Sequence, residues 1–96
     1  MTEKGMKFDG EKLRYDLIDW TFVEGLADIL TRGAAKYKPH NWKYVADAEE
    51  RYFAALMRHI VAWRLGEKID PESKKHHLYH ACCNLMFLIW FDNKKK

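Results

Sequence analysis

Two stretches of the chain carry basic and imidazole side chains at helical spacing. On one face of residues 49–65, steps of three and four residues bring together Arg51, Ala55, Arg58 and Ala62. One face of residues 74–92 carries His77, His80 and Asn84. Arginine is rarely buried without a partner, so two such faces turned toward one cavity would form a site for an anion. We expect a basic cavity with few carboxylates, suited to an anion with a flat organic part, such as a nucleotide.

Each type of side chain has an expected role toward such a ligand. Forked guanidinium groups suit phosphate, which makes Arg51 and Arg58, with Lys36, the candidates for phosphate contacts. Tyr37 and Trp42 could stack on bases, and Asn41 and Asn84 could read base edges. The imidazoles could donate to phosphate or ribose: His59, His77 and His80. Arg14, in a polar N-terminal arm of similar chemistry, completes the candidates. The alternatives are surface arginines lying over the core, and Trp42 as a packing residue.

The same histidines could instead bind a metal, because imidazole suits zinc, iron and nickel. His77 and His80 could chelate one ion, with His59 as the third ligand, or all three could be hydrogen-bonding core residues. No cysteine or carboxylate has an obvious place beside them on this stripe. The chain also lacks a glycine-rich phosphate loop, a nucleophile elbow and a His-Glu-x-x-His motif. We therefore predict binding without a metal or other cofactor and without catalytic residues.

Composition limits the partners. The net charge of +3 comes from the tail Lys94–Lys96, so the rest of the chain is near neutrality and should not bind long nucleic acid. No apolar run is long enough to span a bilayer, and no secretory signal is visible, so we expect no membrane association. The adjacent Cys82 and Cys83 cannot easily form a disulfide within a helix, which indicates free thiols in a reducing, cytoplasmic compartment.

The periodicity predicts one all-α domain over residues 1–96. An extended arm (1–16) precedes a helix over 17–33 that Asp19 caps. It ends at Gly33, or it extends through residues 34–37 and is ended by Pro39. Asp47 opens a second helix that Gly66 closes, and Asp70-Pro71 should begin a third. Residues 81–91 are apolar nearly all round, which a helix tolerates only when it is buried on every side or shared between subunits. We therefore expect a three-helix domain that a partner copy completes into a bundle, as a dimer or tetramer.

Four segments in order resemble a phage family of proteins described as dATP/dGTP diphosphohydrolase N-terminal-like: KFDGEKLRYDLI, RGAAKYKPHNW, ERYFAALMRHIVAWRLGEKIDPES and HLYHACCNLMFL. That resemblance implies a relation to the all-α pyrophosphohydrolases of the MazG type. Those enzymes bind magnesium through paired carboxylate motifs, Glu-x-x-Glu and Glu-x-x-Asp. This chain departs from the pattern, since Phe53 follows Glu50 at the third position and the third helix reads His77-Leu78-Tyr79-His80. A site with basic groups in place of carboxylates should keep the nucleotide and lose the hydrolysis.

The chain also resembles the phage sponge proteins that defeat CBASS immunity by sequestering cyclic dinucleotides without cleaving them. We therefore predict a sponge that acts in the cytoplasm of an infected bacterium and binds a cGAMP-like signal. The alternative is a magnesium-dependent dATP/dGTP diphosphohydrolase with its carboxylates in an unfamiliar arrangement, drawn from Glu49, Glu50, Glu67, Asp70 and Glu72. A third possibility is a helical interaction module whose apolar last helix is the partner surface.

Overall fold

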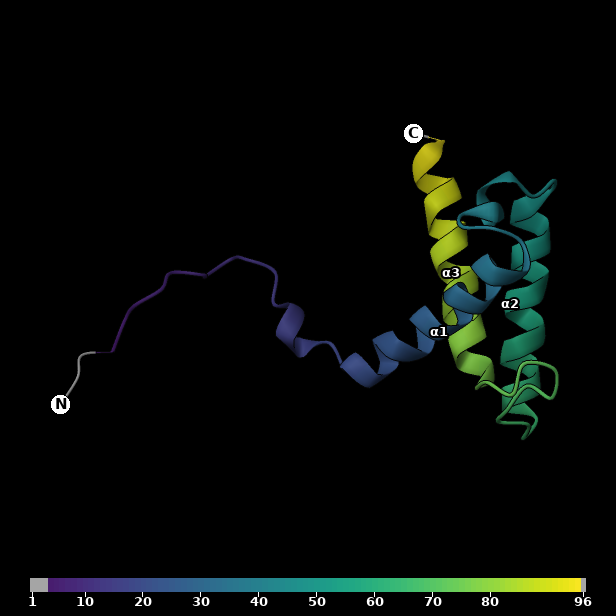
Figure 1. Ribbon diagram of the computed structural model, residues 1–96, viewed down its shortest axis with the longest axis horizontal. Coiled ribbons are helices and arrows are strands. Elements are labelled where there is room, and N and C mark those ends of the chain that lie inside the picture. Colours follow the sequence, from purple (N-terminus) through teal and green to yellow (C-terminus); the bar gives the residue numbers. More distant parts are fainter. Residues whose placement is uncertain (1–3, 96) are drawn as a thin grey trace.

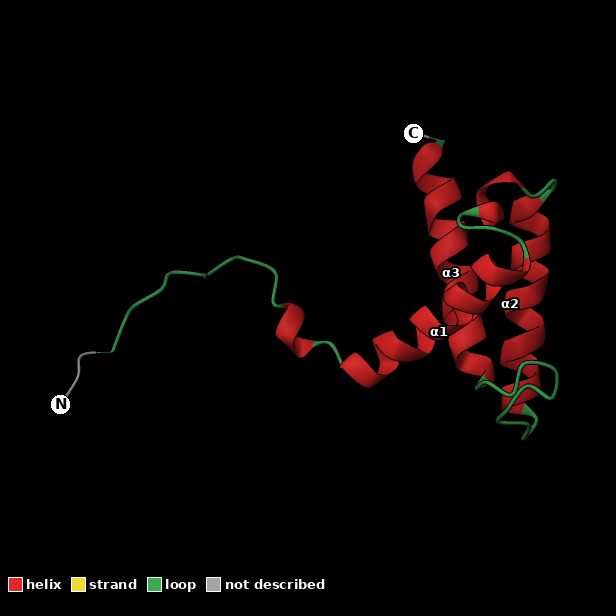
Figure 2. Ribbon diagram, in the orientation of Figure 1, coloured by secondary structure: helices red, strands yellow, loops and turns green. Residues whose placement is uncertain are grey.

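The computed structural model describes residues 4–95, which form three α-helices and two short 3-10 helices. The α-helices are α1 (Trp20–Lys36), α2 (Ala48–Arg64) and α3 (His77–Lys94), and the 3-10 helices are η1 (Tyr15–Leu17) and η2 (Asn41–Tyr44). Within the described residues there is no strand, only an isolated antiparallel bridge between Ile69 and His76 (Figure 2). The predicted small all-α fold with three main helices is confirmed.

The third helix is the centre of the packing. It lies along α2 and also contacts α1, which crosses the pair (Figure 1). Residues 4–19, which precede α1, extend away from the three helices (Figure 1). The radius of gyration is therefore 17.8 Å, against about 12 Å for a compact chain of this length. The structure agrees with the predicted arm over the residues it describes, whereas residues 1–3 of that arm lie outside them.

The first helix begins later than the sequence predicts, and of the two predicted ends it takes the later one, just ahead of Pro39. Asp19 is its N-cap, because its side chain accepts a hydrogen bond from the Thr21 amide at 3.1 Å. The predicted stop at Gly33 is wrong, since the amide of Tyr37 still donates to the Gly33 carbonyl at 2.9 Å. A glycine inside a helix costs only about 1 kcal/mol. The residue before Pro39 is driven out of helical geometry, so the helix ends just ahead of it.

A second glycine on α1 allows close contact with α3. A Cβ built on Gly25 would lie 2.5 Å from Cζ of Tyr79, whereas a Cβ on Gly33 meets nothing within 4 Å. We expect Gly25→Ala to lower the free energy of unfolding, since overpacking costs about 1–3 kcal/mol and exceeds the gain in helix propensity. Gly33→Ala, the same change on the same helix, should instead stabilise by up to about 1 kcal/mol. Urea unfolding of both variants measures the difference, and equal midpoints would show that Tyr79 moves aside at no cost.

The face of α2 that contacts the rest of the molecule is the predicted one only in part. The apolar spacing predicts that five residues cover the core side: Phe53, Leu56, Met57, Ile60 and Trp63. Leu56 is buried and Ile60 is partly buried, as are Tyr52 and His59, whereas Phe53, Met57 and Trp63 are exposed. Arg51 and Arg58, expected to face inward, are exposed as well. Each arginine lies one position before a residue of the inward face, so it stands at the edge of the interface with α3 rather than in it.

The third helix begins at His77, and the predicted start at Asp70-Pro71 is wrong. His76 is the N-cap, and its Nδ1 accepts a hydrogen bond from the Leu78 amide at 3.0 Å. Asp70 instead accepts from the amide of Ser73 at 3.0 Å, and this stabilises a turn in the connecting loop. The loop before α3 therefore brings carboxylates against the start of that helix.

The rest of α3 is apolar but only partly covered by α1 and α2. Ala81 and Cys83 are buried, whereas Leu85 and Ile89 are 44% and 58% exposed. The cysteines are unpaired, and burial raises the pKa of the Cys83 thiol to about 11, which makes it a poor nucleophile. Among the described residues, no helix has the length and hydrophobicity needed to cross a membrane. Lys96 of the predicted basic tail lies outside the described residues.

Candidate functional site

A polar cavity of 590 Å³ lies where the end of α2, the connecting loop and the start of α3 meet one side of α1. We call it the polar cavity, and its lining consists of Arg32, Arg58, His59, Asp70, Glu72, Ser73, His77 and His80. The three predicted imidazoles are therefore brought together, and Arg58 is beside them. The expectation of few carboxylates is wrong, because Asp70 and Glu72 lie in the lining and Glu67 bonds to His77. All three lie in the loop between α2 and α3, where the sequence predicts that the third helix already begins at Asp70-Pro71.

The imidazoles are linked to one another and to polar groups of the loop. Nδ1 of His59 lies 2.8 Å from Nδ1 of His77, and Nε2 of His77 lies 2.7 Å from Oε1 of Glu67. The rings of His59 and His80 are stacked, with centroids 4.5 Å apart and planes at 8°. Nε2 of His80 lies 2.7 Å from Oγ of Ser73. These contacts fix the ring orientations, so the site is pre-organised rather than a set of mobile surface groups.

Burial and mutual repulsion keep two of these imidazoles neutral. The pKa of His59 falls from 6.5 to about 4, first through burial and then through His80 and His77, although Asp70 acts in the opposite direction. The pKa of His80 is also lowered, mainly by burial, while the Asp70 carboxylate opposes the change. The permanent positive charges of the polar cavity are those of Arg32 and Arg58.

Depressed histidine pKa values make the fold sensitive to acid. The unfolded chain takes up protons on these imidazoles near pH 6.5, whereas folded His59 does so only near 4. Stability should therefore fall as the pH is lowered through this interval, and it should be independent of His59 above it. Urea midpoints measured across the interval test this, and His59→Gln should flatten the dependence. His40→Asn, which removes an exposed histidine at a backbone φ of 64° that asparagine tolerates, should leave it unchanged.

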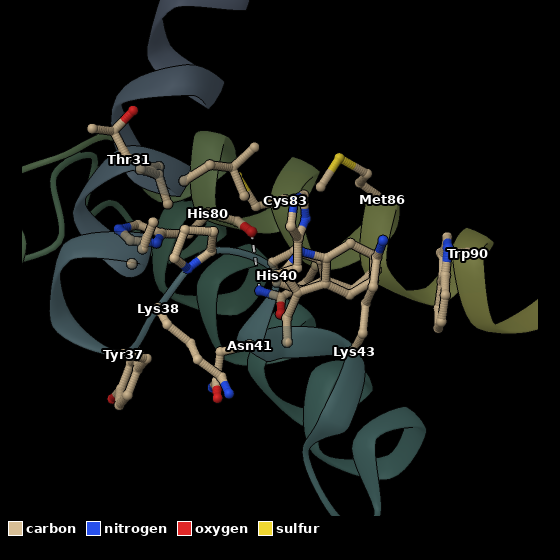
Figure 3. A pocket seen from close by; sticks show the side chains of 18 residues that line it. Thr31, Tyr37, Lys38, His40, Asn41, Lys43, His80, Cys83, Met86 and Trp90 are labelled. Atoms are coloured by element: carbon tan, nitrogen blue, oxygen red, sulfur yellow. Dashed lines mark hydrogen bonds between the residues drawn. The ribbon is translucent and has the colours of Figure 1, made fainter.

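A second cavity of 720 Å³ adjoins the first (Figure 3). We call it the apolar cavity, and it is formed by the second half of α1, the segment 37–43 and the face of α3 from His80 to Trp90. Its apolar walls include Ile29, Met86 and Phe87, with Tyr37 near its edge. Lys38, Asn41 and Lys43 add polar groups to the lining (Figure 3). Such a cavity suits a planar ring with a few polar atoms.

The most aromatic part of this wall is already packed. Trp42 stacks on Phe87 with centroids 4.6 Å apart and meets Trp90 edge to face at 5.3 Å. Its carbonyl accepts a hydrogen bond from the Tyr52 hydroxyl at 3.0 Å. Trp42 is therefore chiefly the packing residue that holds the segment 37–43 on α3, which was the alternative reading. Tyr37, at 62% exposure, is the freer aromatic ring for stacking.

Three of the predicted ligand residues line neither cavity: Arg14, Lys36 and Arg51. Arg14 pairs with Asp16 at 2.7 Å on the arm, and Nη1 of Arg51 lies 3.4 Å from the Ala46 carbonyl oxygen. The other eight line one cavity or both: Tyr37, Asn41, Trp42, Arg58, His59, His77, His80 and Asn84. Asn84 is buried and donates to the carbonyl of His80 at 3.0 Å.

Several residues that line the two cavities were not predicted from the sequence. Some of them carry a signal that is visible there. Arg32 follows Asp28 by four residues, a spacing typical of a helical ion pair, and the two lie 3.2 Å apart. Asp70, Glu72 and Ser73 follow one another closely in the loop, where turn-forming residues were visible. No pattern in the chain indicated that Lys38 and Lys43 would lie opposite α3.

The carboxylates proposed as the alternative magnesium ligands do not converge. Glu49 lies at the start of α2 and pairs with Lys95 at 2.7 Å, whereas Glu67, Asp70 and Glu72 follow its other end. A helix of 17 residues separates the two groups by roughly 25 Å. In the described part of the chain, no three His, Cys, Asp or Glu side chains are arranged to hold a metal ion. Within the described residues, the five carboxylates therefore do not form one common set of ligands.

Fold and site together define a small all-α domain in which an apolar cavity and a polar cavity meet. The chain belongs to the family described as dATP/dGTP diphosphohydrolase, N-terminal, which matches residues 2–96. It is 36% identical over 91 residues to a protein of Salmonella phage PMBT28 named dATP/dGTP diphosphohydrolase. That match covers 95% of this chain and 31% of the relative. No solved structure matches the chain.

Proposed function

We propose that this chain binds a nucleotide across the two cavities, with the base in the apolar cavity and the phosphates in the polar cavity. The observation that carries this is the position of His80, which lines both. A planar base needs apolar walls and a few polar atoms, and a phosphate needs guanidinium or imidazole donors. The apolar cavity and the polar cavity adjoin, so the base and the phosphates of one nucleotide can each lie in the cavity that suits them.

The preferred ligand class is a purine deoxynucleoside triphosphate. The Salmonella phage relative is named for dATP and dGTP, and its match with this chain covers 31% of its length. We propose that the chain contributes nucleotide binding to such a diphosphohydrolase activity. The cleavage step is not assigned to residues of this chain, since the carboxylates described above do not gather around an ion.

A second candidate is sequestration of a cyclic dinucleotide without cleavage, as in the sponge proteins that defeat CBASS immunity. The observation that favours it is the donor set of the polar cavity, where two arginines and three imidazoles lie beside Asp70 and Glu72. Donors of this kind suit the phosphodiester of an intact ligand. Two copies of the chain would supply two base-binding cavities for its two bases.

One experiment separates the candidates. The purified protein is titrated calorimetrically with dATP, dGTP and a panel of cyclic dinucleotides. Each mixture is then incubated with magnesium, denatured and analysed by chromatography. Release of diphosphate from dATP or dGTP supports the hydrolase, and return of an intact, tightly bound cyclic dinucleotide supports the sponge. If no nucleotide binds at micromolar concentration, nucleotide binding itself is rejected.

We further propose that the chain assembles with copies of itself. Apolar side chains are exposed on α2 and α3, with Phe53 at 57% and Ile89 at 58%, and on the arm, with Phe8 at 83% and Leu13 at 78%. Exposed apolar groups on several elements of so small a domain favour burial against another copy. Sedimentation equilibrium should give a dimer or tetramer, and a monomer at all concentrations would reject the assembly.

A further inference from the structure

The hydrogen-bond chain Glu67–His77–His59 determines which nitrogen of His59 is available to a ligand. The Glu67 carboxylate can only accept, so Nε2 of His77 carries the hydrogen in their 2.7 Å contact. In the neutral form of His77, Nδ1 is an acceptor, so the 2.8 Å contact then requires Nδ1 of His59 to donate. Nε2 of His59 is left with a lone pair and has no hydrogen-bond partner among the described residues. The network therefore assigns an accepting nitrogen to a side chain that lines the polar cavity.

An accepting nitrogen is unsuited to phosphate, whose ionised oxygens also only accept. The charged groups around His59 do not compensate for this mismatch between an accepting nitrogen and phosphate. Those that face it from α1, α2, the loop and α3 are Arg32, Arg58, Glu67, Asp70, Glu72, His77 and His80. Apart from the imidazoles, two guanidinium groups face three carboxylates. An anion would therefore enter a cavity without excess positive charge and would meet a lone pair on His59.

We propose that the polar cavity takes up the ligand's phosphate together with one proton, which binds to Nε2 of His59 and is donated in a hydrogen bond to a phosphate oxygen. This rests on the proposed function, because it specifies how the phosphate half of that site works. The proton comes from solvent: an O–H bond of a hydronium ion breaks as the Nε2–H bond of His59 forms, and no other covalent bond changes. The protonated ring keeps its Nδ1 bond to His77, whose other nitrogen remains bonded to Glu67.

The energetics give the coupling a definite sign. In the free protein, burial and the neighbouring imidazoles hold the pKa of His59 at about 4, so this ring is unprotonated at neutral pH. A bound phosphate dianion raises that pKa because it favours the imidazolium. Between the two values, affinity should weaken by about tenfold for each unit of pH increase per proton taken up. Above the higher value the dependence should disappear.

The test uses sulfate as the probe, because this tetrahedral dianion does not itself titrate in the relevant range. Long-range proton–nitrogen NMR of the imidazoles reports the tautomer and protonation state of each histidine in the unmodified protein. Without sulfate, His59 should show hydrogen on Nδ1 alone. With sulfate at neutral pH, it should show hydrogen on both nitrogens, while exposed His40 should not change. A His59 that carries hydrogen on Nε2 in the free protein, or one that stays neutral with sulfate bound, overturns the proposal.

Variants and a second ligand separate this proposal from the proposed function. His59→Gln cannot take up a proton, so its affinity for sulfate should not vary with pH, whereas His40→Asn should keep the dependence of the original protein. If dATP binds to the protein but sulfate binding is independent of pH, proton uptake is wrong and nucleotide binding stands. If sulfate binds with proton uptake and no nucleotide binds, nucleotide binding is wrong and proton uptake stands. Failure of both ligands to bind overturns both.

Discussion

Arg58→Glu should reduce nucleotide affinity by about 100-fold or more while the fold is retained. A hydrogen bond to a charged group contributes about 1.5–3 kcal/mol, and reversal of the charge adds repulsion to its loss. Arg58 lines the polar cavity, is exposed and makes no hydrogen bond or ion pair with another described residue. Its replacement should therefore leave the free energy of unfolding nearly unchanged. Calorimetric titration with dATP and with a cyclic dinucleotide measures the loss, and urea unfolding checks the fold.

Arg51→Glu is the matched control. Arg51 lies two helical turns earlier on α2 and is exposed, as Arg58 is. Its replacement by glutamate changes the net charge by the same amount. It lines neither cavity, so its affinity should change by less than about threefold, as expected for a screened charge at a distance. Equal losses in the two variants would show that the ligand lies along the whole exposed edge of α2 and that the polar cavity is not the phosphate site.

Leu56→Ala should be the most destabilising single change among these predictions. Leu56 is 6% exposed and is the only large aliphatic side chain in the buried core of the described residues. Removal of a buried leucine side chain costs about 2–5 kcal/mol, a large part of the roughly 5–15 kcal/mol available to a small domain. The urea midpoint should fall steeply with little change in the slope of the transition.

Leu65→Ala provides the comparison at the end of the same helix. Leu65 is 82% exposed, so the same truncation should change the free energy of unfolding by no more than about 0.5 kcal/mol. If Leu56→Ala were equally mild, the interface between α2 and α3 could not be the core of the fold. A loss of stability that depends on protein concentration would indicate that Leu56 also supports the assembly.

Much of the fold was predictable from local signals. The Asp19 cap and the Pro39 barrier bracket α1, and apolar periodicity locates α2 and α3. The errors occur where two local signals compete. Asp70-Pro71 has the chemistry of a helix start, yet the side chain of Asp70 turns the loop and His76 caps α3. Local propensity cannot decide between two caps six residues apart, because packing against α2 and α1 selects the one that is used.

The site was predicted in its residue types and less well in its arrangement. The sequence alone predicts that imidazoles three residues apart share a helix face and that arginines accompany them, because helical spacing is a local property. Only the tertiary structure decided that Arg58 joins His59, His77 and His80 while Arg51 does not, and that Asp70 and Glu72 lie beside them. The rotation of α2 about its axis sets which of its faces meets α3. That rotation depends on how the side chains of both helices interlock, and spacing within one helix does not specify it.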